Sequence, residues 1–574
     1  MNIIFKALKI IDSKQKKKLS FLFFLSLIAS FLELLGIGII LPFLTSLVSD
    51  DQIINLSFLT FGGKFNPNLF DIKIFFLSAI LIVFFSKNIY LFFQLKYQSK
   101  IIYEVAENLS SKLFKIYLNL NIIDFKLKNT SSLIRNTTTE VNTFCSGYLN
   151  SFIIILTEIF LLLVIITFLL FLNLKLTLIS LIFLTLISLI IYLSLKKKIL
   201  FLGKLRQTNE AGRLQHLTQG FGSIKDIKLS NNEYKFLNDF NIRNQNCLKS
   251  TREYFVLSNL PRLLLEFLGI LTFLIIFYIL IGQSSDPKNI LPEAGVFFIA
   301  FFRMMPSANK ILVSIQSLNF AKVSIDLLEK ELTNSKNNIS KNVTTKDVDF
   351  NFEEQIEIEN LSFKYKNENK NYDLFNLNFK IKKGEILGIT GPSGSGKSTL
   401  VDLILGFYNP NQGSIKVDGK NINLNLSSWQ NIIGYVPQSI FLIDDTIKEN
   451  IILSDNSNTI DDQRLKNATQ KSELNPFIDN LDKKLETMVG ERGSRISGGQ
   501  LQRIGIARAL YKKSKLLIFD EATNALDKKT EESILQTIFD LKTDYTSIIV
   551  SHDKDCLKKC DRVIGLNKGE INYE

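Results

Sequence analysis

Long apolar stretches in the N-terminal half constrain this chain more than any other feature of its sequence. A helix needs about 20 mainly apolar residues to cross the hydrocarbon core of a bilayer. Six stretches meet this requirement: Phe21–Val48, Ile72–Leu95, Phe152–Leu172, Leu176–Leu195, Phe255–Ile281 and Pro292–Leu318. Inside lipid, every backbone polar group must find its partner within the protein, which a helix achieves alone. The chain therefore predicts six membrane-spanning helices, the last bent at Pro306.

The composition changes after the sixth stretch. Residues 331–349 are rich in Asn, Ser, Thr and Lys, which is typical of a linker. Beyond them, strand patterns alternate with helical ones, and the apolar run Ile386–Thr390 has the pattern of a buried strand. We therefore expect a transmembrane domain over residues 1–330 and a separate α/β domain over residues 350–574.

The distribution of charge explains the formal net charge of +13. Basic residues crowd the N-terminus and the polar stretches 96–135 and 196–252, whereas the other connections between spans hold chiefly Lys64, Lys175 and Lys288. This asymmetry is the positive-inside pattern of a multi-pass membrane protein and predicts a cytoplasmic N-terminus. Attraction to anionic headgroups then accounts for the charge, and no nucleic-acid partner is expected.

Three connecting segments carry further expectations. The two long polar stretches have helical periodicity, which predicts cytosolic extensions of the spans, and each contains a break where the chain can reverse, at Asn119–Asp124 and at Gln219–Gly222. A reversal there leaves a short transverse segment able to press on a cytosolic domain. The apolar patch Ile53–Phe61, on the opposite side, fits either a short helix on the membrane surface or an ordinary loop.

A glycine-rich turn follows the strand Ile386–Thr390 and matches the P-loop pattern. The residues expected around a nucleotide are Gly391, Ser393, Gly394, Ser395, Gly396, Lys397, Ser398 and Thr399. Its glycines let backbone N–H groups turn toward phosphate oxygens, Lys397 reaches the β- and γ-phosphates, and the Ser398 hydroxyl binds Mg²⁺. The helix N-terminus behind the turn favours anions. ATP and Mg²⁺ are therefore the expected cofactors.

A second apolar strand, Leu516–Phe519, ends in two carboxylates. Paired acids at a strand end are a weak signal alone, but they are a strong one behind a P-loop. Asp520 is expected in the magnesium shell. Glu521 is expected to act as general base for the water that attacks the γ-phosphate, or to orient that water.

The segment Ser497-Gly498-Gly499-Gln500, followed by Gln502-Arg503, matches the signature of ABC proteins. The chain resembles ABC exporters along essentially its whole length. This resemblance implies an α-helical six-span transmembrane domain of the type IV exporter kind, followed by an α/β P-loop nucleotide-binding domain. It also implies a half-transporter that forms a dimer, most simply a homodimer. In such a dimer, the signature residues of one copy close over ATP bound at Lys397 of the other.

Further positions match ABC exporters residue by residue. Tyr365 stands where an aromatic side chain stacks on adenine. Gln438 fits the magnesium-binding loop that faces the membrane helices, His552 fits the γ-phosphate sensor, and Asn524–Asp527 fits a loop of the dimer interface. The sequence departs from many exporters after His552, where Asp553 follows instead of Arg. Because Glu521 and His552 are both present, each composite site is expected to hydrolyse ATP.

Charged residues inside the spans are costly and are candidates for function. Cations outnumber acids there, and the candidates for substrate binding are Lys87, Arg262, Arg303 and Lys310. If they face the interior of a twofold dimer, they form a basic belt that suits an anionic substrate, and Arg suits phosphate in particular. The alternative is that Glu266 pairs with Arg262 and that Lys87 extends toward the interface.

The segments Pro261-Arg262 with Glu266 and Gly269, and Arg303 to Lys310, resemble bacterial lipid-linked oligosaccharide flippases of the PglK type. This resemblance implies that a polyprenyl-pyrophosphate-linked oligosaccharide is moved from the cytoplasmic to the outer leaflet of the bacterial inner membrane, with the nucleotide-binding domain in the cytoplasm. Two alternatives stay open. One is an ABC exporter of lipid A-like lipids, drugs or peptides, and the other is a non-transporting ABC ATPase, which the six spans disfavour.

Overall fold

The structure of the chain, a computed structural model, divides into two compact units. It describes residues 2–40, 43, 69–283, 287–339, 349–365, 372–453, 460–522, 528–540, 542 and 544–573. The first unit comprises Met1–Leu120 and Lys126–Ile339, and the second comprises Asn121–Phe125 and Ser340–Glu574. Two segments considered above, Ile53–Phe61 and Asn524–Asp527, lie outside the described residues.

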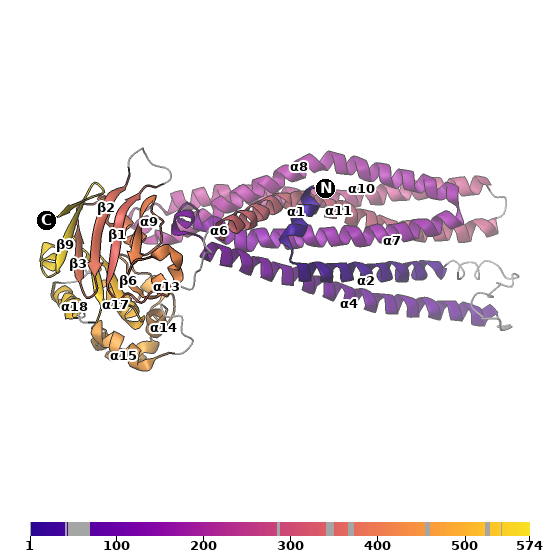
Figure 1. The fold of residues 1–574 in the computed structure, drawn as a ribbon. Coiled ribbons are helices and arrows are strands. Elements are labelled where there is room, and N and C mark those ends of the chain that lie inside the picture. Colours follow the sequence, from indigo (N-terminus) through magenta and orange to yellow (C-terminus); the bar gives the residue numbers. More distant parts are fainter. Residues whose placement is uncertain are drawn as a thin grey trace. The chain divides into compact units, whose positions relative to one another are not determined.

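Among the described residues, six helices of the first unit are long and apolar enough to cross a membrane, which confirms the predicted number of spans. The long helices lie side by side (Figure 1). The helices of this unit are α1 (Asn2–Ile10), α2 (Ser13–Gly38), α4 (Leu69–Leu118), α6 (Thr130–Arg135), α7 (Asn150–Leu172), α8 (Leu174–Gly222), α9 (Ile224–Leu229), α10 (Glu233–Gln283) and α11 (Pro287–Ile339), with the π-helical segments η2 (Asn136–Glu140) and η3 (Thr143–Leu149) before α7.

Several of these helices are far longer than a membrane requires. At about 1.5 Å per residue, the 50 residues of α4 span roughly 75 Å, against a hydrocarbon core of about 30 Å. The polar extensions predicted from the sequence are therefore continuous with the spans. Helix α11 also runs through 331–339, the first part of the predicted linker, because that stretch contains neither Pro nor Gly to end it.

The chain reverses at the predicted break Asn119–Asp124, and directly after the other predicted break, Gln219–Gly222, whose residues are still helical. Helix α8 ends at Gly222, the short α9 follows, and α10 begins at Glu233. At the other break, α4 ends at Leu118 and α5 (Ile122–Lys126) follows. The side chains of Ile122 and Ile123 in α5 pack on the hydrophobic core of the second unit.

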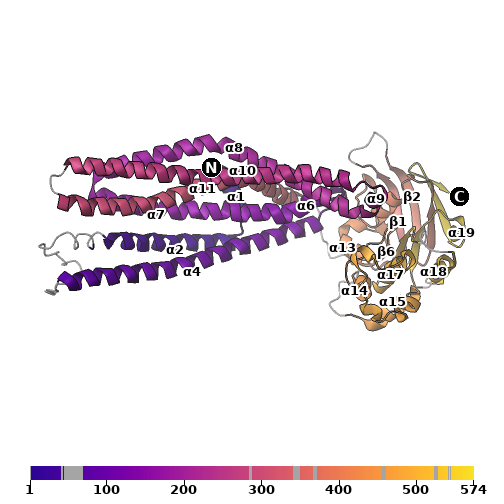
Figure 2. The same ribbon diagram turned by 180° about the vertical axis from the view of Figure 1, so that it is seen from behind.

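Helices α8 and α11 approach very closely at one point in the bundle. An added Cβ at Gly203 in α8 would lie 2.4 Å from the backbone oxygen of Phe320 in α11. Seen from behind, α2 and α4 lie along one side of the bundle, and α8 and α10 lie along the opposite side (Figure 2). Gly203 therefore sets the distance between α11 and the α8–α10 pair.

The described residues of the second unit form two sheets. A four-stranded sheet has the order β2-β1-β4-β5, and a six-stranded sheet has the order β10-β9-β3-β8-β7-β6. The strands are β1 (Gln355–Phe363), β2 (Leu374–Lys382), β3 (Ile386–Thr390), β4 (Gln412–Val417), β5 (Lys420–Asn421), β6 (Ile433–Val436), β7 (Leu516–Asp520), β8 (Thr546–Val550), β9 (Arg562–Asn567) and β10 (Glu570–Tyr573). The α-helices are α12 (Lys397–Ile404), α13 (Leu426–Asn431), α14 (Ile447–Ile452), α15 (Asp462–Lys471), α16 (Asn475–Asp479), α17 (Gly498–Tyr511), α18 (Lys528–Asp540) and α19 (Lys554–Leu557).

The strand order of the six-stranded sheet explains where a site can form. Strands β3, β8, β7 and β6 pair in parallel, and the middle strands β7 and β8 are buried along their whole length. Continuous apolar runs are typical of such central parallel strands. Because β3 and β7 run in the same direction, their C-terminal ends lie at the same end of the sheet. The P-loop, which follows β3, and the two carboxylates at the end of β7 therefore lie close together.

The close approach at Gly203 gives a stability prediction. A Gly203→Ala variant should lower the melting temperature of the purified protein, because overpacking costs about 1–3 kcal/mol and exceeds the about 0.5–1 kcal/mol that Ala gains over Gly in a helix. Gly220→Ala, in the same helix, is the matched control, since its added Cβ would meet nothing within 4 Å. Equal melting temperatures for the two variants would contradict the close packing.

Candidate functional site

The P-loop has a backbone that only glycine adopts easily. Gly396, directly before α12, has φ = +103°, and Gly391 has φ = +150°. An added Cβ would lie 2.6 Å from Cδ2 of Leu374 at Gly396, and 2.2 Å from the carbonyl oxygen of Leu566 at Gly391. These contacts explain why the turn needs glycine, and they fix the loop against β2 and β9.

A cavity of about 540 Å³ brings the predicted ATP-site residues together. The P-loop and the start of α12 form one wall, and the others come from the segment before β2 and from the segments after β6, β7, β8 and β9. Its lining residues are Tyr372, Asp373, Ser393, Gly394, Gly396, Lys397, Ser398, Thr399, Gln438, Glu521, His552 and Lys568. Residues separated by more than a hundred positions in the sequence therefore surround one polar space.

Glu521 is the centre of the hydrogen bonds in this cavity. Its Oε2 accepts a hydrogen bond from Nε2 of Gln438 at 2.6 Å, and its Oε1 lies 3.0 Å from Nε2 of His552. Glu521 also has φ = +50°, an unusual conformation for a residue other than glycine. Such strain is found where the surrounding structure holds a functional side chain in place. The geometry fixes this carboxylate with two polar partners on its two oxygens.

Burial and charge shift the pKa values of the two groups beside Glu521. Burial raises the pKa of the Asp520 carboxyl, although the Tyr435 hydroxyl, 3.3 Å away, donates a hydrogen bond to it and opposes the shift. Burial lowers the pKa of the Lys397 amine, and the carboxylates of Glu521 and Asp520 oppose this change. A cation bound beside Asp520 would favour its charged form.

The chemistry of the cavity fits a triphosphate with its magnesium ion. The Lys397 amine donates to the carbonyl oxygens of Gly391 at 2.8 Å and Pro392 at 3.1 Å, both within its own loop. The buried Ser395 hydroxyl has no hydrogen-bond partner among the described residues. A lysine bonded only to neutral carbonyls and an unpaired buried donor both suit an anion. Ser398, Asp520 and Gln438 offer oxygen atoms, which Mg²⁺ prefers.

Of the other predicted elements of the ATP site, Tyr365 lies beside this cavity, whereas the signature residues do not line it. The Tyr365 hydroxyl lies 3.2 Å from Oγ1 of Thr399, which lines the cavity. Ser497, Gly498, Gly499 and Gln500 are not among the lining residues. They form the N-terminus of α17, where Ser497 and Gln500 hydrogen-bond reciprocally in a capping box. Within one chain, the signature and the P-loop are therefore separate surfaces.

Sequence reasoning missed three residues of the cavity, namely Tyr372, Asp373 and Lys568. Lys568 lies in the tight turn between β9 and β10, where it has φ = +47°. The neighbouring Gly569 donates a hydrogen bond from its amide to the carbonyl oxygen of Ser395. No local pattern indicates that this turn meets the P-loop, because the contact depends on the pairing of β9 with β3.

The cations inside the spans are paired with carboxylates. Glu33 of α2 is buried and forms ion pairs with two cations, Lys87 of α4 at 3.2 Å and Arg303 of α11. The Lys87 amine also lies 4.4 Å from the ring centroid of Phe84. Lys87 therefore points into the bundle and is only 7% exposed. Glu33 ties three helices together.

The other two cations line one cavity in the first unit. Its volume is about 560 Å³, and its polar lining residues are Arg262, Glu266, Asn309 and Lys310. Arg262 pairs with Glu266 at 2.8 Å, both in α10, and Lys310 of α11 pairs with Glu158 of α7 at 2.6 Å. The rest of the lining is mainly apolar, with Phe302 and Met305 among it. The structure thus brings Arg262 and Lys310 together, whereas Lys87 and Arg303 meet at Glu33.

Comparisons with known proteins agree with this two-part architecture. Residues 18–308 match a family described as "ABC transporter transmembrane region", and residues 374–524 match one described as "ABC transporter". The "Structure of a bacterial Atm1-family ABC exporter with ATP bound" superposes with a TM-score of 0.77 and 19% sequence identity, over 98% of this chain and 95% of that one. This likeness confirms the predicted fold class.

Curated relatives are similar over a shorter stretch. The "Iron-sulfur clusters transporter ATM1, mitochondrial" of Kluyveromyces lactis is 42% identical over 38% of this chain and 30% of its own length. A "Probable ABC transporter ATP-binding/permease protein" of Haemophilus influenzae is 37% identical over 39% and 40%. "Leukotoxin translocation ATP-binding protein LktB" of Mannheimia glucosida is 42% identical over 38% and 30%. The matched stretch is therefore about two fifths or less of each relative.

The shared carboxylate Glu33 gives a prediction about the membrane unit. A Glu33→Gln variant leaves two cations without their acid, and removing one partner of a buried pair costs about 3–5 kcal/mol. We expect a marked drop in the melting temperature of the purified protein. Glu266→Gln, whose pair is exposed, is the matched control and should change it little. A Glu33→Gln protein as stable as Glu266→Gln would contradict the role of Glu33.

Proposed function

This chain belongs to the ABC transporter family, and from that premise we propose that it is one half of a dimeric, ATP-driven transporter in the bacterial inner membrane. The observation that carries the proposal is the cavity shared by Lys397, Gln438, Glu521 and His552, in a chain whose other unit has six candidate spans. The proposed arrangement has the nucleotide-binding domain in the cytoplasm, as the basic connections indicate.

The proposed mechanism uses two copies of the chain. Lys397 and the P-loop amides of one copy bind the phosphates of ATP, and Tyr365 stacks on the adenine. Ser497 to Gln500 of the second copy cover the same nucleotide with the N-terminus of α17, which favours anions. This arrangement is supported by the separation of the P-loop and the signature within one chain. Closure of the two copies around ATP would move the segments that join the membrane helices.

Hydrolysis is assigned to the carboxylate side of the cavity. Ser398, Gln438 and Asp520 would hold Mg²⁺, which neutralises the charge that develops on the phosphates during transfer. Glu521 accepts a proton from the attacking water or orients it. Gln438 and His552, on its two oxygens, keep the carboxylate in position. Loss of the γ-phosphate removes the charge that holds the two copies together, so they separate.

The proposed substrate is a polyprenyl-pyrophosphate-linked oligosaccharide, flipped from the cytoplasmic to the outer leaflet. The support is the cavity that Arg262 and Lys310 share, whose lining is otherwise apolar except for Glu266 and Asn309. The hydrogen bond from Arg262 to Glu266 uses Nε, and a guanidinium has five N–H donors. The terminal N–H groups can therefore bind a pyrophosphate in the bidentate geometry that Arg favours, while the ion pair persists.

One observation favours a second candidate, an exporter of less charged cargo such as drugs or lipids. The Arg262–Glu266 and Lys310–Glu158 pairs are each neutral overall, so this cavity has no excess cation. A neutral, largely apolar cavity also suits an apolar molecule. The two candidates differ in whether Arg262 is needed for stimulation by the cargo.

A mixed-dimer experiment tests whether the ATP site forms between two copies. Lys397→Ala and Ser497→Ala chains should each hydrolyse ATP poorly, because every site in either homodimer has one defect. When the two chains are co-expressed, a mixed dimer places both defects in one site and leaves the other intact. We therefore expect the mixture to regain a substantial part of the wild-type rate. A mixture no more active than its parents would indicate that the site forms within one chain.

A reconstitution experiment tests the substrate. In liposomes, a polyprenyl-pyrophosphate glycan should raise the ATPase rate of the wild type, and Arg262→Gln should reduce this stimulation several-fold while leaving the basal rate nearly unchanged. Lys175→Gln removes an equal charge from the first turn of α8 and is the control. A Glu521→Gln protein, which lacks the proposed base, gives the background ATPase rate of the assay. Stimulation by lipid A or apolar drugs instead of the glycan would support the second candidate.

A further inference from the structure

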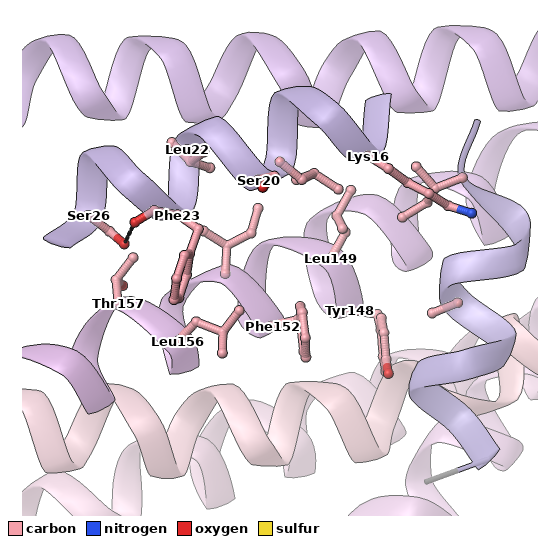
Figure 3. Close-up of a pocket in the computed structure, with 14 residues that line it drawn as sticks. Lys16, Ser20, Leu22, Phe23, Ser26, Tyr148, Leu149, Phe152, Leu156 and Thr157 are labelled. Atoms are coloured by element: carbon pink, nitrogen blue, oxygen red, sulfur yellow. Dashed lines mark hydrogen bonds between the residues drawn. The ribbon is translucent and has the colours of Figure 1, made fainter. Parts of the chain in front are cut away.

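A second apolar cavity lies in the first unit, away from the cavity of Arg262 and Lys310. It lies between the N-terminal helices α1 and α2 on one side and η3 and α7 on the other (Figure 3). Its volume is about 240 Å³, and almost all of its lining atoms are apolar. Leu22 and Phe23 of α2 and Phe152 and Leu156 of α7 contribute to this lining. Among the described residues that line it, Lys16 of α2 supplies the one charged side chain.

The cavity is elongated along the helices. On α2, its lining extends from Lys16 to Ser26, and on the facing elements it extends from Tyr148 to Thr157. At about 1.5 Å per residue, both stretches are roughly 14–15 Å long. A volume of about 240 Å³ is below the roughly 300–1,000 Å³ of a pocket that takes a whole drug-sized molecule. The space therefore suits one hydrocarbon chain whose polar end stays outside.

Positive charge gathers where the apolar run of α2 begins. Lys9, Lys14, Lys16 and Lys17 are exposed and form no ion pair with the described residues, unlike Lys18, which pairs with Glu104. At the other end of the cavity, the Ser26 hydroxyl donates to the carbonyl oxygen of Phe23 in its own helix. The cavity thus has a cationic end and an uncharged end, which is the polarity of an anionic lipid.

Helix α1 strengthens this assignment. It buries Ala7 and Ile10 against the bundle, whereas Phe5 is 65% exposed and Lys9 is exposed. A short helix with an apolar side chain and lysines exposed together is typical of the interface between headgroups and hydrocarbon. α1 also supplies Ala7 to the cavity lining. The end of the cavity that Lys16 lines therefore lies beside a helix of the interfacial type, where a lipid headgroup would meet the lysines.

We propose that this cavity binds one acyl chain of an anionic glycerophospholipid from the cytoplasmic leaflet, with the headgroup beside Lys16. The bound lipid would fill the space between α1–α2 and η3–α7 and attach the N-terminal helices to the membrane. Binding here does not depend on which molecule is transported, because the cavity shares no lining residue with that of Arg262 and Lys310.

Photolabelling of the full-length protein in nanodiscs tests the proposal. The probe is phosphatidylglycerol with a diazirine in one acyl chain, and phosphatidylcholine with the same group is the neutral comparison. Labelled peptides should map to residues 16–26 and 148–157, and phosphatidylglycerol should label them several-fold more strongly. Lys16→Gln should reduce this labelling about fivefold, the effect of one lysine near an anionic headgroup. Lys17→Gln, which removes a neighbouring charge outside the lining, should reduce it less.

A second pair of variants tests the cavity itself. Thr157→Phe fills it, and Thr167→Phe makes the same change on α7 outside it. The two threonines make equivalent hydrogen bonds to their own helix, at 2.9 and 2.8 Å. We expect Thr157→Phe to abolish labelling at these peptides and Thr167→Phe to preserve it. Should Thr157→Phe fail to fold, the difference in labelling between Lys16→Gln and Lys17→Gln still tests the proposal.

Three results would overturn the proposal. Equal labelling by the two phospholipids would show that charge plays no part. Equal effects of Lys16→Gln and Lys17→Gln would indicate a diffuse attraction to the membrane surface. Displacement of the label by polyprenyl phosphate, but not by unlabelled phosphatidylglycerol, would assign the cavity to the transported lipid instead.

Discussion

Ion pairs along α11 hold the membrane unit together. Arg303 pairs with Glu33 of α2, Lys310 pairs with Glu158 of α7, and the Ser324 hydroxyl donates to the buried Glu140 of η2. Because an isolated charge between helices in a membrane is costly, each pair also fixes which helices are neighbours. α11 therefore makes polar contacts with α2, α7 and η2, from its apolar part to its polar extension.

The polar contacts around Glu140 extend this arrangement beyond the apolar spans. Glu140 is fully buried and also lies 3.2 Å from Arg206 of α8 and 3.8 Å from Arg135 of α6. It ends the π-helical segment η2, and such segments are frequent at functional sites. α11 is the last helix before the second unit along the chain. Within the first unit, Glu140 therefore links α6, α8 and α11.

How much of the fold and of the candidate site can be predicted from the sequence depends on how far apart in the chain the contacting residues are. The six spans follow from apolar runs, and the P-loop, Asp520 and Glu521 follow from short motifs whose strand context is also local. Lys568 could not be found in this way, because it reaches the ATP cavity only through the pairing of β9 with β3. The sequence shows that Glu33 is an acid within a span. Its ion pairs with Lys87 and Arg303 depend on how three helices pack, which the sequence does not show.

The same limit applies to the cations of the spans. The charges in the sequence suggest one basic belt. A cation that is paired with a carboxylate, however, attracts an anion less strongly than an unpaired cation does. Of the contacts that Lys87, Arg262, Arg303 and Lys310 make with carboxylates, the group around Glu33 has one positive charge in excess, whereas the other two pairs are neutral. Recognition of a pyrophosphate at Arg262 and Lys310 would therefore rest on directed hydrogen bonds from groups that are already neutralised. Binding of this kind depends on the fork geometry of Arg262, so replacing it by Lys would lose more than replacing Lys310 by Arg.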